Sequence, residues 1–278
     1  MNMKILHAVH PDDFSKYGTA LIRERFLLDI AQSDEPVFVY THYDRMVAGA
    51  ISPIKKSLFL GNYDNLKSNY FLERREMGII NVGGEGLVIA DDKEYVLQKL
   101  DCLYLGKGVR EVSFRSVAGA EQPAVFFILS APAHTAYPNA IMTNAAASRV
   151  DLGTQQTANR RTIYKYIHAD GIQSCQLVMG LTILHEGSIW NTMPPHTHDR
   201  RMEVYFYFDL EPEHRVFHYM GQPDETRHIL IGNHQAVVSP PWSIHAGSGT
   251  SNYSFIWGMA GENMEFTDMD GVAIKDIR

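Results

Sequence analysis

The chain has 278 residues, of which 45% are hydrophobic and 21% are charged, as in a globular protein with a well-buried core. Its 25 Lys and Arg against 32 Asp and Glu give a net charge of −7, which argues against nucleic acid or an anionic membrane as a partner. The two cysteines are isolated from each other, which indicates reduced thiols in a reducing compartment. The sequence shows no secretory signal and no apolar run near the roughly 20 residues that cross a bilayer, which indicates a soluble protein. We therefore expect a cytoplasmic protein.

The predicted elements begin with one helix and continue as strands. Residues 20–32 carry apolar side chains near helical spacing and predict an amphipathic helix. Short runs rich in Val, Ile, Tyr and Phe then follow between Gly, Pro, Asn and Asp: VFVYTHY, GIINVGG, LVIADDKEYVL, CLYLGKG, VSFRSV and AVFFILS. Asp91 and Asp92 separate two apolar runs and predict a hairpin. This pattern indicates an all-β fold, either a sandwich or a barrel.

The composition of the chain changes near its middle. Residues 131–160 are polar, rich in small side chains and weakly periodic, which is typical of a linker. Strand-like runs resume after this segment and continue almost to the C-terminus. We therefore expect two β domains, an N-terminal one of residues 1–140 and a C-terminal one of residues 141–278.

One group of side chains in the second half has the spacing of a metal site. Alternate residues of a strand point to the same face, so His196 and His198 can direct both imidazoles at one point. Glu203 has the wrong parity for the same strand, so we predict a turn through residues 199–201. His245 follows a Pro-Pro turn. Three imidazoles and one carboxylate suit Zn, Mn, Fe, Co or Ni and leave coordination positions open for a substrate.

A faint internal repeat indicates that only the second domain carries this site. Arg74-Arg75 and Arg200-Arg201 each open an apolar strand, at an offset of 126 residues (200 minus 74). At that offset, the first three ligand candidates correspond to Tyr70, Leu72 and Met77. Because these side chains offer a metal little to bind, we expect a structural first barrel and a chemical second one.

The ligand candidates resemble the two cupin motifs, which are HxH followed by Glu and a later Pro-x-Gly-x-x-His. The matching residues are His196, His198, Glu203, Pro240 and His245. Trp242 replaces the usual Gly of the second motif, a departure that affects the predicted turn and leaves the ligands intact. The resemblance implies two cupin-type (jelly-roll) β-barrels in one chain.

Longer strings narrow the resemblance. The chain is similar to the 5-keto-4-deoxyuronate isomerase family, the ketol-isomerases of bacterial pectin breakdown, in NTMPPHTHDRRMEVYFYF, GQPDETRHI, SPPWSIH, FIWGMAGEN, DMDGVAIKDIR, YFLERREMGIINVGG, LYLGKG and APAHTAYP. The similarity covers nearly the whole chain. It implies one Zn²⁺ per chain on the four ligands, a hexamer, and a small uronate substrate. The implied reaction converts 4-deoxy-L-threo-5-hexosulose uronate to 3-deoxy-D-glycero-2,5-hexodiulosonate.

Such a reaction moves a proton between adjacent carbons and therefore needs a base. The sequence leaves several candidates open, which are Glu203, Tyr205, Tyr207 and Glu262. Glu203 can serve if its bond to the metal is weak. Tyr205 is also a candidate substrate contact, because alternation along MEVYFYF places it on the same face as Glu203.

The substrate carboxylate should meet a cation. Arg160, Arg161 and Lys165 in NRRTIYKY are the first candidates, because Arg can hold a carboxylate through two parallel hydrogen bonds. Arg201 and Arg227 are alternatives. If these cations only face solvent at a domain entrance, none of them contacts the substrate.

Two other functions are compatible with the ligands. A cupin dioxygenase would bind iron or copper and consume oxygen, whereas a non-catalytic sugar-binding cupin would show no turnover. The retained ligands argue against the non-catalytic cupin, and the whole-chain resemblance argues against the dioxygenase. Ligand chemistry alone does not separate an isomerase from a dioxygenase.

Overall fold

The computed structural model describes residues 3–117 and 122–278. The chain divides into two compact units: unit 1 contains Met1–Leu6, Ile30–Ser148 and Tyr166–Met179, and unit 2 contains His7–Asp29, Arg149–Lys165 and Gly180–Arg278. Each unit therefore takes one segment from the opposite half of the sequence. The expected boundary at residue 140 stays a prediction, because the compact units exchange segments across it.

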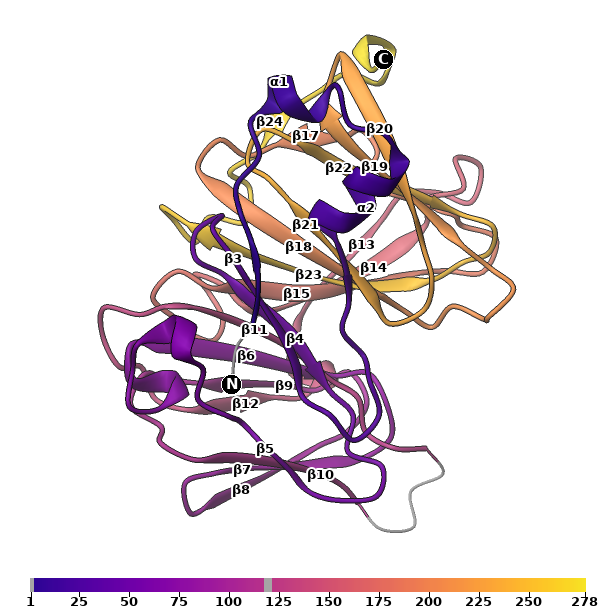
Figure 1. Cartoon of the computed structure of the whole chain (residues 1–278). Coiled ribbons are helices and arrows are strands. Elements are labelled where there is room, and N and C mark those ends of the chain that lie inside the picture. The colour runs from indigo at the N-terminus through magenta and orange to yellow at the C-terminus, as the bar shows by residue number, and fades with distance from the viewer. Residues whose placement is uncertain (1–2, 118–121) are drawn as a thin grey trace. The chain divides into compact units, whose positions relative to one another are not determined.

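Unit 1 contains a seven-stranded and a four-stranded sheet (Figure 1). The larger sheet has the order β1 (Lys4–Leu6), β3 (Val37–Thr41), β4 (Val47–Ile51), β11 (Phe126–Pro132), β6 (Arg75–Asn81), β9 (Cys102–Leu105) and β12 (Ala140–Met142). The smaller sheet has the order β5 (Leu58–Phe59), β10 (Val112–Ser116), β7 (Gly86–Ala90) and β8 (Lys93–Leu97). Paired strands are antiparallel apart from β1, which is parallel to β3.

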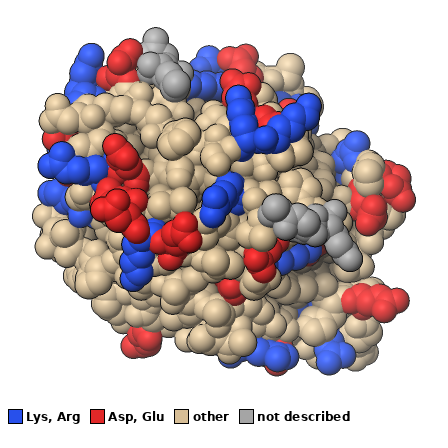
Figure 2. Space-filling view, turned by 90° about the horizontal axis from the view of Figure 1, so that it is seen from below, with Lys and Arg blue, Asp and Glu red and all other residues tan. Residues whose placement is uncertain are grey.

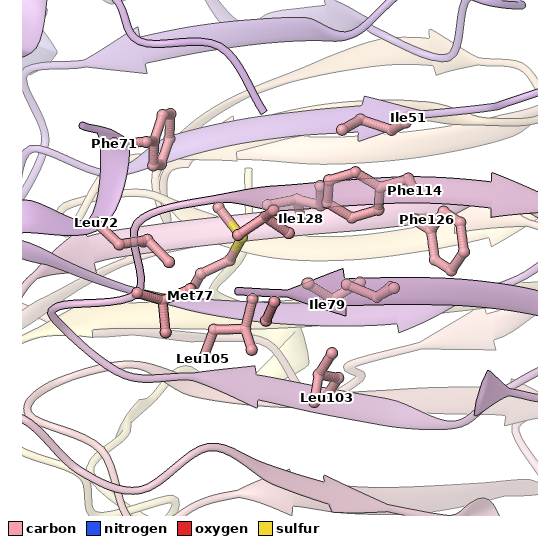
Figure 3. Packing of buried hydrophobic residues seen from close by; sticks show 14 of the residues in the cluster. Ile51, Phe71, Leu72, Met77, Ile79, Leu103, Leu105, Phe114, Phe126 and Ile128 are labelled. Atoms are coloured by element: carbon pink, nitrogen blue, oxygen red, sulfur yellow. The ribbon is translucent and has the colours of Figure 1, made fainter. Parts of the chain in front are cut away.

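The core of unit 1 is formed by apolar side chains from both of its sheets. Ile79 of β6 and Phe114 of β10 belong to the same buried cluster (Figure 3). Leu72 and Met77 are completely buried in this cluster, at positions that the repeat aligns with two candidate metal ligands. Burying one such side chain contributes roughly 1.5–3 kcal/mol. In unit 1, apolar core residues therefore occupy these two of the positions at which unit 2 carries candidate metal ligands.

Most residues of the remaining strands belong to unit 2. The second seven-stranded sheet has the order β13 (Ser148–Leu152), β14 (Arg161–Ile167), β15 (Val178–Leu184), β23 (Ser254–Gly261), β18 (Arg201–Phe208), β21 (Gln235–Ser239) and β2 (Leu27–Asp29). A four-stranded sheet has the order β16 (Trp190–Asn191), β22 (Ile244–Gly249), β19 (Val216–Gln222) and β20 (Glu225–Ile231). The short strands β17 (His196–Thr197) and β24 (Asp270–Gly271) form a separate pair. The all-β prediction is confirmed.

Helices are short. They are α1 (Pro11–Phe14), α2 (Thr19–Phe26) and the 3-10 turns η1 (Asp64–Leu66), η2 (Phe71–Glu73), η3 (Asn144–Ala146) and η4 (Ile274–Asp276). The helix expected over residues 20–32 was predicted too long, because the chain pairs as β2 with β21 from residue 27 onward. No helix in the described residues is long and apolar enough to cross a membrane.

Two local predictions in the middle of the chain had different outcomes. Ala90 pairs with Lys93 across the turn formed by Asp91 and Asp92, so the predicted hairpin is confirmed. The segment 131–160, expected to be a linker, contains β12 and β13. The segment forms strands despite its weak periodicity because its backbone groups add to the edges of existing sheets, as β12 does to β9.

The charged surface is mixed in sign. On the face shown in Figure 2, Lys and Arg side chains lie among Asp and Glu side chains, with uncharged residues between them. This face carries no extended region of one sign, which agrees with the small net charge of −7.

Glu76 in β6 is a completely buried carboxylate that organises a loop of unit 1. Its Oε1 accepts the backbone N–H groups of Gln176 and Leu177, both at 2.9 Å. Its Oε2 accepts the N–H of Cys175 at 2.6 Å and the hydroxyl of Tyr104 at 2.8 Å. Four donors therefore point at one anion, which explains why a charge is retained in the core.

We expect Glu76→Gln to destabilise the protein by about 2–4 kcal/mol, because the amide would direct N–H groups at backbone N–H donors. Urea unfolding followed by fluorescence measures the change. Glu94→Gln, the same substitution at an exposed site of β8, should cause almost no change. Equal stability of the two variants would show that Glu76 does not hold the loop.

Candidate metal centre

The four ligand candidates converge on one point in unit 2. His196, His198, Glu203 and His245 each offer one ligand atom, and these atoms lie within 4.8 Å of one another. Nε2 of His245 lies 3.0 Å from Nε2 of His196 and 2.8 Å from Oε2 of Glu203. His196 is partly buried and the other three are buried. The structure thus brings together the residues that the sequence spacing singled out.

The local backbone explains this convergence. His196 lies in β17 and His198 follows that strand, so both imidazoles reach the same side. The turn expected over residues 199–201 is present at residues 199–200, because Arg201 already belongs to β18, and Glu203 is the third residue of that strand. His245 is the second residue of β22, which belongs to the four-stranded sheet. The site is therefore assembled from three strands, and β17 is fixed by pairing with β24 near the C-terminus.

The protonation of His198 tests whether a cation fits this cluster. Nδ1 of His198 lies 2.5 Å from the carbonyl oxygen of Asp268, which can only accept, so Nδ1 carries the proton and Nε2 a lone pair. That Nε2 faces Oε2 of Glu203 at 3.4 Å. Both atoms are buried, and neither has a hydrogen-bond partner in the part of the chain described. Two facing lone pairs repel each other unless a cation lies between them, so the residues fit a metal.

Burial and mutual charge keep two of these side chains deprotonated. Burial, and then the neighbouring charge of His245, lowers the pKa of His196 to about 2. Burial alone would raise the pKa of Glu203, but the charge of His245 and the close contacts with the rings of His198 and His245 hold that pKa well below its ordinary value. Near neutral pH both groups are therefore in the form that binds metal.

A segment near the C-terminus contacts His198 and the two arginines that follow it in the sequence. Arg200 forms ion pairs with Asp268 at 2.5 Å and Asp270 at 2.8 Å. Arg201, completely buried, donates from Nη2 to the carbonyl oxygen of Asp268 at 2.9 Å. These contacts hold the carbonyl that orients His198. Sequence reasoning missed Asp268 because it lies 70 residues from His198, and no short-range spacing connects the two.

A pocket of about 230 Å³ opens onto the cluster. His196, His198 and Glu203 line it, and much of the wall is apolar, including Phe255, Trp257, Met259 and Phe266. Within the described residues, Arg161 is the one Lys or Arg that lines this pocket. A small molecule in this pocket would therefore meet the candidate metal ligands, the cation of Arg161 and an apolar wall.

Two of the three predicted substrate contacts reach this pocket. Arg161 and Tyr205 line it, and the Tyr205 hydroxyl lies 3.0 Å from Oγ1 of Thr192, a third lining residue. Lys165 does not line it, because its Nζ lies over the ring of Phe266, 5.1 Å from the ring centre. The structure therefore favours Arg161 over Lys165 as the contact for an anionic substrate.

The other candidates for the base lie outside the pocket lining. Tyr207 is completely buried, and its hydroxyl lies 2.7 Å from Nδ1 of His218. Glu262 is exposed and follows the end of β23. Arg160, a candidate contact for the substrate carboxylate rather than a base, precedes Arg161 and is also exposed. Glu203 and Tyr205 are thus the two base candidates that can touch a molecule in the pocket.

His218 makes stability depend on pH. Burial, followed by the charge of His245, lowers the pKa of His218 to about 3, whereas an unfolded histidine titrates near 6.5. Protonation therefore favours the unfolded chain, and stability is lost as pH falls from 6.5 toward 3, by up to about 1.4 kcal/mol per pH unit. We expect His218→Gln to flatten this dependence in urea unfolding between pH 4 and 7. The exposed His228→Gln should keep the wild-type slope, and equal slopes for all three proteins would contradict the prediction.

Solved structures share the fold. An IolB-like protein from Salmonella typhimurium LT2 matches with a TM-score of 0.71 at 15% identity, over 89% of this chain and 96% of that one. The oxalate decarboxylase of Lactobacillus farciminis matches with a TM-score of 0.55 at 8% identity, over 82% and 79%. Fold and cluster together define an all-β protein of the cupin type whose His and Glu side chains could hold a metal ion.

Sequence comparison is more specific. The model of the KduI/IolB family matches residues 30–274, and the chain belongs to this family. The 4-deoxy-L-threo-5-hexosulose-uronate ketol-isomerase of Halalkalibacterium halodurans is 53% identical over 99% of this chain and 100% of its own length. The enzyme of the same name from Yersinia pseudotuberculosis is 52% identical over 99% and 100%. The predictions of an enzyme, an intramolecular oxidoreductase of the ketol-isomerase type, and of the family resemblance are confirmed.

Proposed function

We propose that the protein is a metal-dependent aldose–ketose isomerase that converts 4-deoxy-L-threo-5-hexosulose uronate (5-dehydro-4-deoxy-D-glucuronate) to 3-deoxy-D-glycero-2,5-hexodiulosonate in the breakdown of pectin and other uronates. The observation that carries this proposal is one pocket lined by three residues of the His and Glu cluster and, as its one cation among the described residues, by Arg161. The names of relatives at 51–53% identity support it.

The proposed metal is Zn²⁺, one ion per chain, with His196, His198, Glu203 and His245 as ligands. Three neutral imidazoles and a carboxylate are ligands that zinc commonly takes, although Mn, Fe, Co and Ni accept them too. When bound, such an ion supplies a Lewis acid that polarises a carbonyl group and makes the neighbouring C–H more acidic.

The other pocket residues orient the substrate. Arg161 binds the carboxylate of the uronate, so the opposite end of the open-chain sugar faces the cluster. The apolar wall excludes water from the reacting carbons, which strengthens electrostatic interactions inside the pocket. The Tyr205 hydroxyl, held by Thr192 at 3.0 Å, donates a hydrogen bond to a substrate oxygen.

Glu203 is the proposed base. Its Oε2 faces His198 and His245, at 3.4 and 2.8 Å, and its side chain also lines the pocket. The second oxygen, Oε1, can therefore take the proton from one substrate carbon and return it to the adjacent carbon. Balance also requires the hydroxyl proton of the first carbon to move to the former carbonyl oxygen of its neighbour. With both transfers the aldose becomes a ketose of the same composition.

An anaerobic assay on the 5-keto-4-deoxyuronate from a complete pectate-lyase digest tests the function. We expect turnover to the diulosonate that disappears after chelation and returns when zinc is added. No turnover by metal-loaded protein would contradict the proposal. Oxygen consumption would then indicate a dioxygenase, and sugar binding without turnover would indicate a non-catalytic cupin.

The quaternary structure and location belong to the same proposal. By its resemblance to the 5-keto-4-deoxyuronate isomerase family, we propose a homohexamer that acts in the cytoplasm on a small molecule. Light scattering during size-exclusion chromatography should give six times the chain mass of 31.4 kDa. A monomer or dimer at micromolar concentration would contradict the hexamer and leave the assignment of the pocket unaffected.

A further inference from the structure

Unit 1 contains a second cavity that shares no lining residue with the pocket at the metal centre. Its volume is about 350 Å³. Four of its lining residues are cationic, namely Arg45, Lys67, Arg74 and Arg75, and no Asp or Glu lines it within the described residues. The rings of Tyr40 and Phe71 form part of the wall. A cavity with this lining is suited to an anion.

Arg75 is the unusual member of this group. Its side chain is only 7% exposed. Nε donates to Oγ of Ser130 at 3.0 Å, and Nη2 donates to the carbonyl oxygens of Ser130 at 2.5 Å and of Arg45 at 2.7 Å. Every acceptor is neutral. These bonds fix the plane of the guanidinium. Burial lowers the pKa of Arg75 to about 10, and the charges of Tyr40 and Glu76 offset only part of that effect.

The two carboxylates that flank Arg74 and Arg75 in the sequence make their hydrogen bonds to other groups. Glu76 accepts three backbone N–H groups and the hydroxyl of Tyr104. Glu73 accepts hydrogen bonds from the backbone and side chain of Asn69, at 2.9 and 2.7 Å. Arg74 donates to two backbone carbonyl groups and forms no ion pair in the described structure. Arg75 forms no direct ion pair in the described residues, so an anion bound in the cavity would give this buried charge the close partner that it lacks.

We propose that this cavity binds the oxyanion group of a small metabolite, a carboxylate or a phosphate carried by a molecule about the size of a sugar. Its volume falls at the low end of small-molecule pockets, roughly 300–1,000 Å³. Arg and Lys bind either oxyanion, Nη1 of the fixed Arg75 guanidinium is not used by the bonds to Ser130 and Arg45, and the rings of Tyr40 and Phe71 can pack against carbon.

The internal repeat supports a binding role at the N-terminal end of β6. Arg75 opens β6 in unit 1, as Arg201 opens β18 in unit 2. In unit 2, the start of that strand adjoins the metal-ligand cluster, and Arg201 has a carbonyl partner from the C-terminal segment. In unit 1, the start of the corresponding strand adjoins the cationic cavity. The two units thus carry different chemistry at equivalent strand ends.

Calorimetric titration of the full-length protein at constant ionic strength tests the proposal. The probes are inorganic phosphate, glucose 6-phosphate, galacturonate and neutral galactose. We expect the anions to bind and galactose not to bind. The double variant Arg45→Gln/Lys67→Gln, which changes two exposed side chains, should weaken anion binding by at least about tenfold and leave the isomerase rate unchanged.

Two control variants show whether the bound anion occupies this cavity. Lys55→Gln/Lys56→Gln removes the same charge from exposed positions of unit 1 and should leave affinity unchanged. Arg161→Gln, in the pocket at the metal centre, should also leave phosphate binding unchanged. Tighter binding of glucose 6-phosphate or of galacturonate identifies phosphate or carboxylate as the preferred group. Binding no stronger than that of galactose, or equal in wild type and the Arg45→Gln/Lys67→Gln variant, would overturn the proposal.

Discussion

Replacement of His245 by glutamine is expected to lower isomerase turnover by at least about a thousandfold and to leave far less than one metal ion per chain. His245 contributes an Nε2 that lies 2.8 Å from Glu203 and 3.0 Å from His196. Glutamine has a similar length but no imidazole lone pair. Loss of Lewis-acid stabilisation of several kcal/mol corresponds to this factor, since about 1.4 kcal/mol of barrier changes a rate tenfold.

The measurement combines metal analysis of the purified variant with the anaerobic assay. His228→Gln is the matched control, because it makes the same chemical change at an exposed histidine whose ring lies 5.6 Å from that of Phe217. The control should retain both metal and activity. Wild-type activity in a folded His245→Gln variant would exclude the residue as a ligand needed for the reaction, and would redirect the search to the other three side chains.

The ligand cluster could be predicted from the sequence because its geometry is mostly local. His196 and His198 share a face through strand alternation, and the parity of Glu203 required a turn that the structure contains at residues 199–200. The counterparts of the ligands in the first repeat, including Leu72 and Met77, could also be recognised as unable to bind a metal, and the structure shows that these two are buried in the core. In each case, the relevant neighbours are a few residues apart or are related by one fixed offset.

Features that depend on distant segments could not be predicted in this way. The carbonyl of Asp268 that orients His198 comes from 70 residues away, and its backbone role leaves no mark on residue type. The helix predicted over residues 20–32 ends at Phe26 because β21 offers a pairing edge that helical periodicity does not reveal. Likewise, Arg161 and Lys165 were equivalent candidates until the structure placed only Arg161 in the pocket.

Arg161→Gln should raise the KM for the uronate substrate, with kcat/KM about 10–150 times lower, the loss of one charge-assisted contact of about 1.5–3 kcal/mol. Arg161 is half-buried, and its Nη1 already donates to the carbonyl of Asn159 at 2.9 Å, which fixes the side chain. Burial lowers the pKa of Arg161, yet an arginine stays cationic near neutral pH. A carboxylate in the pocket therefore meets a fixed positive charge.

Three companion variants make this result specific. Arg160→Gln removes an exposed neighbouring charge and should leave KM unchanged. Arg161→Lys keeps the charge but loses the two-pronged geometry, so its KM should fall between those of wild type and Arg161→Gln. Lys165→Gln should have little effect, because that side chain lies over Phe266 and not in the pocket. If KM rises in Lys165→Gln and not in Arg161→Gln, the proposed orientation of the substrate is wrong. Its carboxylate would then lie near Lys165, beyond the ring of Phe266.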